Sequence, residues 1–135
     1  RLLEKGRRAS LFRDSMIPCE VQKADIVLVG ADGVCPEGVV NKMGTMSLAL
    51  AAREFGKPFV VLCSTSKLIP VLEMDAMESE SVLENARIRE TVFELTPLEL
   101  VTAVITDEGV MSGPEIKKRL LKDRGNMKVT ECQSC

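Results

Sequence analysis

The stretch from residue 25 to residue 63 decides the fold. It begins with the run Asp25-Ile26-Val27-Leu28-Val29-Gly30 and ends with the run Pro58-Phe59-Val60-Val61-Leu62-Cys63. Short, uninterrupted apolar runs of this kind are typical of strands that are buried on both faces. Between them, residues 30–40 are rich in Gly and Pro and predict a loop. Residues 43–55 carry Ala and Leu at helical spacing, with Gly56 as the C-terminal stop, and predict a helix.

The order strand, loop, helix, strand predicts a βαβ unit, in which the two strands are parallel and the crossover is right-handed. Residues 104–106 are a third candidate strand. Ser112 and Glu115 have the spacing of a capping box, which predicts a helix that extends to Lys122 and ends at Gly125. The predicted fold class is α/β: a Rossmann-like three-layer sandwich with a mainly parallel sheet.

Two segments have weaker patterns. Residues 9–13 are compatible with a short strand, and Asp14 and Ser15 can cap a turn or short helix that breaks near Pro18. The acidic residues 65–92 predict an irregular surface segment with one helical turn.

The last third of the chain predicts a helix over residues 97–103, with Thr96 as its N-cap. We expect one domain over residues 1–125 and a flexible tail over residues 126–135.

Composition and charge exclude several classes of protein. The chain has 135 residues, of which 45% are hydrophobic and 28% charged, which argues against disorder. The net charge is −2, so no overall basic field favours direct contact with nucleic acid. A local basic patch is interpreted as solvated surface; its members are Lys5, Arg7, Arg8 and Arg13. The apolar runs are far shorter than the ~20 residues of a membrane span, so no membrane contact is expected.

The five cysteines form no regular disulfide pattern, which favours reduced thiols in a soluble, cytoplasmic protein. Cys132 and Cys135 form a C-x-x-C pair, but a second ligand pair is lacking and the chain contains no His. We therefore expect no metal site. Neither a G-x-G-x-x-G motif nor a Walker A motif is present, so we expect no nucleotide and no other cofactor.

Asp32 follows the carboxyl end of the first predicted strand, where ligands of open α/β sheets bind. Its carboxylate lies between small residues and can act as an acid, a base or a hydroxyl acceptor. The alternative is an Asp that stabilises the loop through hydrogen bonds to nearby backbone N–H groups.

The run Asn41-Lys42-Met43-Gly44-Thr45 lies at the predicted start of the helix over residues 43–55. Helix N-termini bind phosphates through free N–H groups, Lys42 adds a charge, Asn41 adds an amide donor, and Gly44 allows close approach to the backbone. The alternative is a plain cap, with Asn41 as the N-cap and Lys42 in solvent.

Lys67 closes the run Ser64-Thr65-Ser66-Lys67 after the second strand, at the same predicted sheet edge as Asp32. It can bind a second phosphate or sugar hydroxyls, or it can belong to an ordinary polar loop.

Four ordered motifs carry a family resemblance. They are Val29-Gly30-Ala31-Asp32, Gly38-x-x-Asn41-Lys42-x-Gly44-Thr45, Phe93-Glu94-x-Thr96-Pro97-x-Glu99-Leu100 and Ile105-Thr106-Asp107-Glu108-Gly109-Val110. In this order they resemble the C-terminal domain of the translation initiation factor 2B and aldose-1-phosphate isomerase family. Asp14-Ser15-Met16 resembles an element that precedes this region in the family.

The resemblance implies a sugar-phosphate partner and assembly into homo-oligomers or with sister subunits. It also implies that Asp32 is catalytic and that Asn41 and Lys42 contact substrate phosphate. The family's catalytic cysteine belongs to a motif upstream of this region, and neither Cys35 nor Cys63 matches it. One hypothesis is therefore half of an isomerase for ribose-1,5-bisphosphate or methylthioribose-1-phosphate, with the isolated chain inactive. The alternative is a non-catalytic regulatory subunit of initiation factor 2B, the guanine-nucleotide exchange factor.

Overall fold

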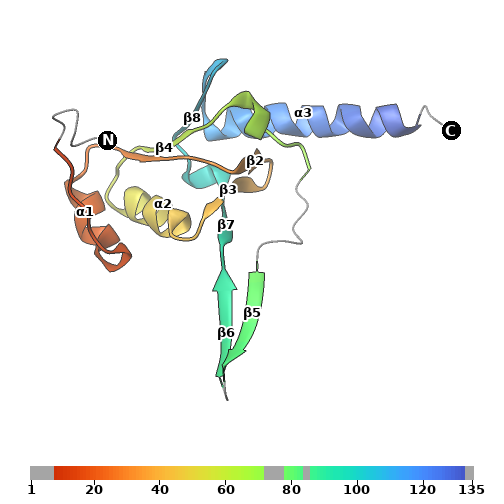
Figure 1. Cartoon of the computed structure of the whole chain (residues 1–135). Helices are drawn as coiled ribbons and strands as arrows, with labels where there is room; N and C mark the ends of the chain where they lie inside the picture. Colours follow the sequence, from red (N-terminus) through yellow and green to blue (C-terminus); the bar gives the residue numbers. More distant parts are fainter. Residues whose placement is uncertain (1–7, 72–77, 84–85, 133–135) are drawn as a thin grey trace.

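The computed structural model describes residues 8–71, 78–83 and 86–132. The helices are α1 (Ile17–Lys23), α2 (Thr45–Glu54) and α3 (Gly113–Cys132), with short 3-10 helices η2 (Asp14–Met16), η3 (Thr65–Lys67) and η4 (Leu98–Leu100). The strands are β1 (Val27–Val29), β2 (Gly33–Cys35), β3 (Gly38–Lys42), β4 (Phe59–Leu62), β5 (Glu78–Leu83), β6 (Ala86–Thr91), β7 (Phe93–Thr96), β8 (Ala103–Thr106) and β9 (Gly109–Met111). The β5–β6 hairpin and the distal part of α3 extend away from the other elements in different directions (Figure 1).

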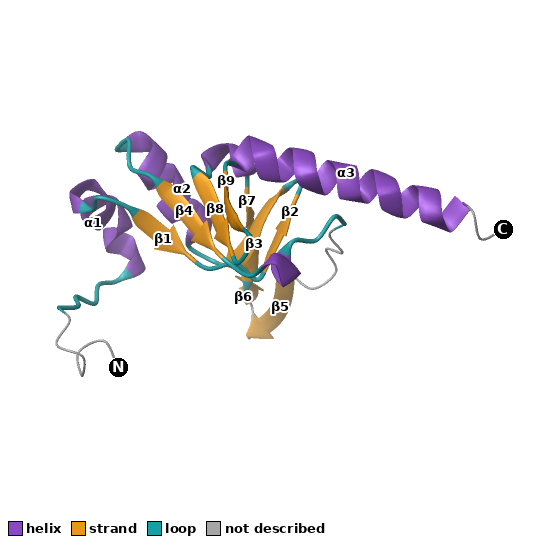
Figure 2. Ribbon diagram, turned by 90° about the horizontal axis from the view of Figure 1, so that it is seen from above, coloured by secondary structure: helices purple, strands orange, loops and turns teal. Residues whose placement is uncertain are grey.

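The main sheet has the strand order β1-β4-β8-β9, and its strands lie side by side in Figure 2. β1 and β8 both pair with β4 in parallel, whereas β9 returns antiparallel to β8. The predicted parallel βαβ unit is confirmed, with α2 between β1 and β4, and residues 103–106 form the third parallel strand. The fold class is α/β with a mostly parallel sheet, as predicted.

A second, antiparallel sheet has the order β2-β3-β7. Residues 30–40 were expected to be a loop, and this prediction is wrong for most of the segment, because β2 and β3 form a hairpin here. Val34 and Val39 of the two strands are fully buried, which gives the hairpin an apolar face to pack. Gly38 is required where β3 meets β7, since a Cβ atom there would lie 2.5 Å from the carbonyl oxygen of Thr96.

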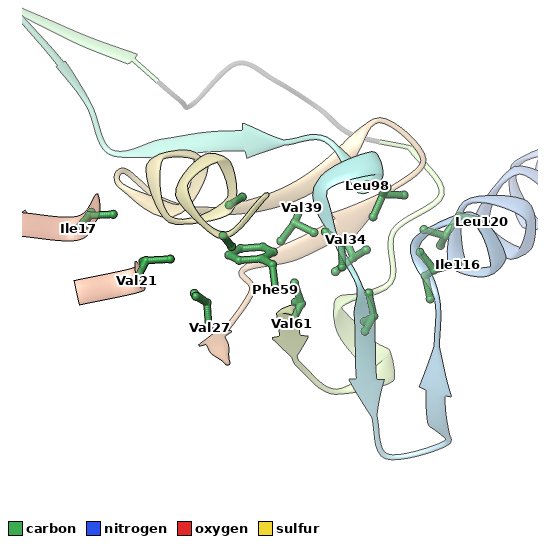
Figure 3. Close-up of a cluster of buried hydrophobic side chains, with 14 residues drawn as sticks. Ile17, Val21, Val27, Val34, Val39, Phe59, Val61, Leu98, Ile116 and Leu120 are labelled. Atoms are coloured by element: carbon green, nitrogen blue, oxygen red, sulfur yellow. The ribbon is translucent and has the colours of Figure 1, made fainter. Parts of the chain in front are cut away.

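The hydrophobic core lies on one face of the main sheet and is aliphatic apart from Phe59, as the composition predicts (Figure 3). Ala49 and Ala52 of α2 belong to the same cluster, and Ile116 and Leu120 of α3 extend it. The expected burial on both faces is confirmed for most of β4, where Phe59, Val60 and Val61 are all buried, but it is wrong for β1, where Leu28 is exposed. The exposed fractions of the large apolar side chains on the other face are 52% for Ile26, 57% for Leu28, 51% for Leu62 and 67% for Val110.

Segments near the N-terminus differ from their predictions. Residues 9–13 form no strand, and all of their side chains are exposed, so no apolar face is available to pack against a sheet. Pro18 does not break α1 but lies in its first turn, where a missing N–H costs nothing.

The acidic segment contains the predicted helical turn, η3, but it also forms the β5–β6 hairpin, which was not predicted. In this hairpin the register pairs Glu80 with Arg89, two residues of opposite charge. Residues 72–77 and 84–85 of the segment lie outside the described residues.

The helices after β7 also differ in extent. The predicted helix over residues 97–103 is only the three-residue η4, and Thr96 ends β7 instead of capping a helix. The capping box is confirmed, because Glu115 Oε2 accepts a 2.7 Å hydrogen bond from Ser112 N. α3 then continues through Gly125 to Cys132, so the predicted end at Gly125 is wrong, and a flexible tail over residues 126–135 stays a prediction. Within the described ranges, no helix has the length and apolar character needed to span a membrane.

Candidate functional site

Polar residues follow three neighbouring parallel strands at one edge of the main sheet. The chain leaves β1 towards Asp32, β4 towards Thr65 and β8 towards Asp107, and β4 lies between the other two strands. Asp107 joins two of these ends, since its carboxylate accepts hydrogen bonds from Thr65 N at 2.6 Å and from Thr65 Oγ1 at 2.9 Å. These two hydrogen bonds hold the pKa of Asp107 below its ordinary value, and the one from the Thr65 backbone has the larger effect.

β2 brings the predicted site residues together from both sides. Asp32 N donates to the carbonyl of Val40 at 2.9 Å, and the β2–β3 register continues so that Asp32 lies across from Asn41. On the other side of β2, Val34 forms a parallel bridge with Leu68, which sets Lys67 beside the start of β2. Asp32, Asn41 and Lys67 therefore converge in backbone register, although 35 residues separate the first from the last.

Asn41 and Lys42 end strand β3 and do not open a helix, so the plain-cap interpretation of Asn41 is wrong. α2 begins at Thr45, and its N-cap is Gly44, whose φ of 103° is the left-handed conformation that favours glycine. The turn is closed by a 3.1 Å hydrogen bond from Asn41 Nδ2 to Thr45 Oγ1, which itself donates to the carbonyl of Lys42 at 2.7 Å.

β7 supplies two neighbours that were not assigned a role from the sequence. The Lys42 ammonium lies 3.8 Å from the centre of the Phe93 ring, and Glu94 Oε1 accepts a 2.9 Å hydrogen bond from Met46 N in the first turn of α2. Both residues stand in the third resemblance motif, but no local pattern shows that they pair with residues about 50 positions earlier. The pairing of β3 with β7 is therefore the information that the sequence analysis lacked.

The two cysteines near this edge are poor nucleophiles. Burial, and then the charge of Asp107, raise the pKa of the Cys63 thiol, although Lys67 opposes them. Burial is also the largest cause of the raised pKa of Cys35, whose Sγ donates to the carbonyl of Gly38 at 3.3 Å. Reactive cysteines have a lowered pKa, so neither thiol has the environment of a catalytic nucleophile.

Comparison with known proteins gives consistent matches. The sequence profile of the initiation factor 2 subunit family, IF-2B, matches residues 1–113. A methylthioribose-1-phosphate isomerase of Pelotomaculum thermopropionicum is 36% identical over 131 residues, which cover 84% of this chain and 36% of the isomerase. A ribose 1,5-bisphosphate isomerase of Archaeoglobus fulgidus is 32% identical, over 91% of this chain and 43% of that enzyme.

Solved structures agree with these relatives. The translation initiation factor eIF-2B of Pyrococcus horikoshii superimposes with a TM-score of 0.73 at 36% identity, over 84% of this chain and 42% of that one. A 5-methylthioribose 1-phosphate isomerase from the same organism gives a TM-score of 0.73 at 28% identity, over 93% of this chain and 40% of that one.

Fold and site define an α/β protein whose polar residues gather at the carboxyl edge of a mainly parallel sheet. The chain belongs to the initiation factor 2 subunit family, whose members include sugar-phosphate isomerases and eIF-2B proteins. It spans about two fifths of the length of the relatives that it matches.

Proposed function

We propose that this chain supplies one wall of a sugar-phosphate site in an aldose-1-phosphate to ketose-1-phosphate isomerase. Asp32 is the acid–base group, and Asn41, Lys42, Gly44 and Lys67 bind the substrate. The observation that carries the proposal is the convergence of Asp32, Asn41 and Lys67 at the start of β2. A carboxylate, an amide and a lysine at one sheet edge are a suitable set of groups for a phosphorylated sugar.

The chemistry requires two things of the protein. The sugar ring must open at a carbon that carries phosphate, and hydrogen must then move from C2 to C1. A carboxylate can accept and return a proton, while Lys42 and Lys67 can hold the phosphates as point charges. By family resemblance, the partner of Asp32 is a cysteine outside this chain. The substrate is ribose-1,5-bisphosphate or methylthioribose-1-phosphate, since relatives named for both match over most of the chain.

The second candidate function is that of a regulatory subunit that binds phosphates or sister chains without catalysis. It is favoured by a Pyrococcus horikoshii relative named as a putative translation initiation factor eIF-2B subunit 2-like protein, which is 36% identical over 113 residues. The carboxylate of Asp32 favours the enzyme, because a non-catalytic member is free to lose it. Both candidate functions involve other chains of the same family as partners.

The test is the affinity of the purified protein for the two sugar phosphates, measured by calorimetry on the wild type and Lys42→Ala. Loss of a charge-assisted hydrogen bond costs about 1.5–3 kcal/mol, so binding should weaken by roughly ten-fold or more. Lys118→Ala, an exposed lysine of α3, is the matched control and should bind as the wild type does. Equal affinity of the wild type and Lys42→Ala contradicts the phosphate-binding role.

A further inference from the structure

Phe93 is the side chain on which Lys42 rests. β3 and β7 are antiparallel, and their register sets Lys42 opposite Phe93 and Asn41 opposite Glu94. The Lys42 ammonium lies 3.8 Å from the centroid of the Phe93 ring, a distance well within the range of a cation–π contact. Phe93 itself is half-buried, whereas the lysine above it is exposed.

The contact with the Phe93 ring restricts the orientation of the Lys42 side chain, which is otherwise flexible. A lysine side chain is a flexible four-carbon stem, and it loses rotamer entropy when it binds an anion. The ring attracts the ammonium on one side, which leaves N–H donors on the other side for a ligand. An ammonium already held in place binds an anion at a lower entropic cost than a mobile one does.

Glu94 fixes the platform that holds this arrangement. Its carboxylate accepts the hydrogen bond from Met46 N, so that β7 is attached to the first turn of α2 directly behind the turn that follows Lys42. Thr96, two residues further along β7, is fully buried opposite Val39, and this anchors the same strand pair at its other end. The Phe93 ring therefore cannot shift along β3 without breaking both attachments.

We propose that Phe93 is a positioning residue of the phosphate site: its ring holds the Lys42 ammonium ready for an anion. The proposal rests on the proposed function of Lys42. It assigns to β7 a part in ligand binding that is independent of any direct contact with the ligand.

The experiment compares Phe93→Leu, Phe93→Tyr and the wild type. The first readout needs no ligand: the ε-methylene protons of Lys42, assigned with the help of Lys42→Ala, should show an upfield ring-current shift in the wild type and Phe93→Tyr. Phe93→Leu should lose it. The second readout is the dissociation constant for inorganic phosphate, which should rise roughly two- to five-fold in Phe93→Leu and stay near the wild-type value in Phe93→Tyr. Phe12→Leu, in the groove beside α1 and β1, controls for the substitution itself.

The outcomes separate the two proposals. If Lys42→Ala weakens phosphate binding but Phe93→Leu does not, the positioning role is overturned and the proposed function stands. A wild type without the ring-current shift also overturns the positioning role, and the binding of Lys42→Ala then decides the proposed function. If the wild type and Lys42→Ala bind phosphate equally, both are overturned. If Phe93→Leu does not fold, Phe93→Met replaces it and should show the same loss of shift and affinity.

Discussion

Charged side chains at the carboxyl edge of the sheet differ in how firmly the fold holds them. Asp107 has both carboxylate oxygens bonded to Thr65, and Lys42 rests on Phe93. Asp32 is exposed, and its backbone rather than its side chain is held by β3. A carboxylate that is fixed in position but open at its oxygens suits acid–base chemistry, whereas one bonded at both oxygens suits structure.

Replacement of Asp32 separates these roles. In a protein that combines this chain with the family's cysteine-bearing region, the nearly isosteric Asp32→Asn should retain the melting temperature and most ligand affinity, while turnover falls roughly 10²–10⁴-fold. Both quantities are measured on one sample of the protein. A lower melting temperature with unchanged turnover per folded molecule would show instead that Asp32 only stabilises the loop.

Asp107 should make stability depend on pH. Its pKa in the folded protein lies below the ordinary value of 3.8, so its contribution is complete above that value and is lost as the pH falls through the folded pKa. In Asp107→Asn the melting temperature should be lower at neutral pH, and its decline in acid should be shallower than in the wild type. Parallel melting curves for the two proteins across the acid range would contradict the role of the Thr65 hydrogen bonds.

Whole elements were predictable where the signal is local. β1, α2, β4 and β8 follow from apolar runs and helical spacing, and the start of α3 follows from its capping box. The β3–β7 pairing joins residues more than 50 positions apart, which no local pattern reveals. The β2–β3 and β5–β6 hairpins pair residues close in sequence, but β propensity depends on packing, and their Gly-rich and acidic segments were predicted as loop and irregular surface. The same limit applies to the site. Asp32 and Lys67 were identifiable as polar residues after predicted strands, and Asn41 and Lys42 as residues at the start of a predicted helix, but Phe93 and Glu94 need the β3–β7 register.

The capping box of α3 offers a test at this scale. Ser112 Oγ donates to Glu115 Oε2 at 2.7 Å, and Glu115 N points back to Ser112 Oγ at 3.4 Å. Ser112→Ala should lower the free energy of unfolding by about 1 kcal/mol, measured by urea denaturation. Ser47→Ala, at an exposed position inside α2, is the control and should not destabilise. A loss equal in both variants would mean that the cap contributes nothing specific.

The molecule as a whole has two exposed surfaces that are relevant to its function. One is the apolar second face of the main sheet, with Leu28, Leu62 and Val110 exposed. The other is the polar edge with Asp32, Lys42 and Lys67, which is also exposed. A groove of about 510 Å³ lies beside α1 and β1, away from these polar residues. Exposed apolar faces are typical contact surfaces, and exposed catalytic groups need cover to exclude water.

We therefore expect the 135-residue chain alone to lack isomerase activity on ribose-1,5-bisphosphate and methylthioribose-1-phosphate. Asp32 is exposed to solvent, so the proposed site lacks the exclusion of water and the second proton-transfer group that the reaction requires. The measurement is product formation by the purified chain, with cooperative thermal unfolding as evidence that it is folded and the Archaeoglobus fulgidus ribose 1,5-bisphosphate isomerase as positive control. Substantial turnover by the chain alone would show that these residues form a complete active site and that no further wall is needed.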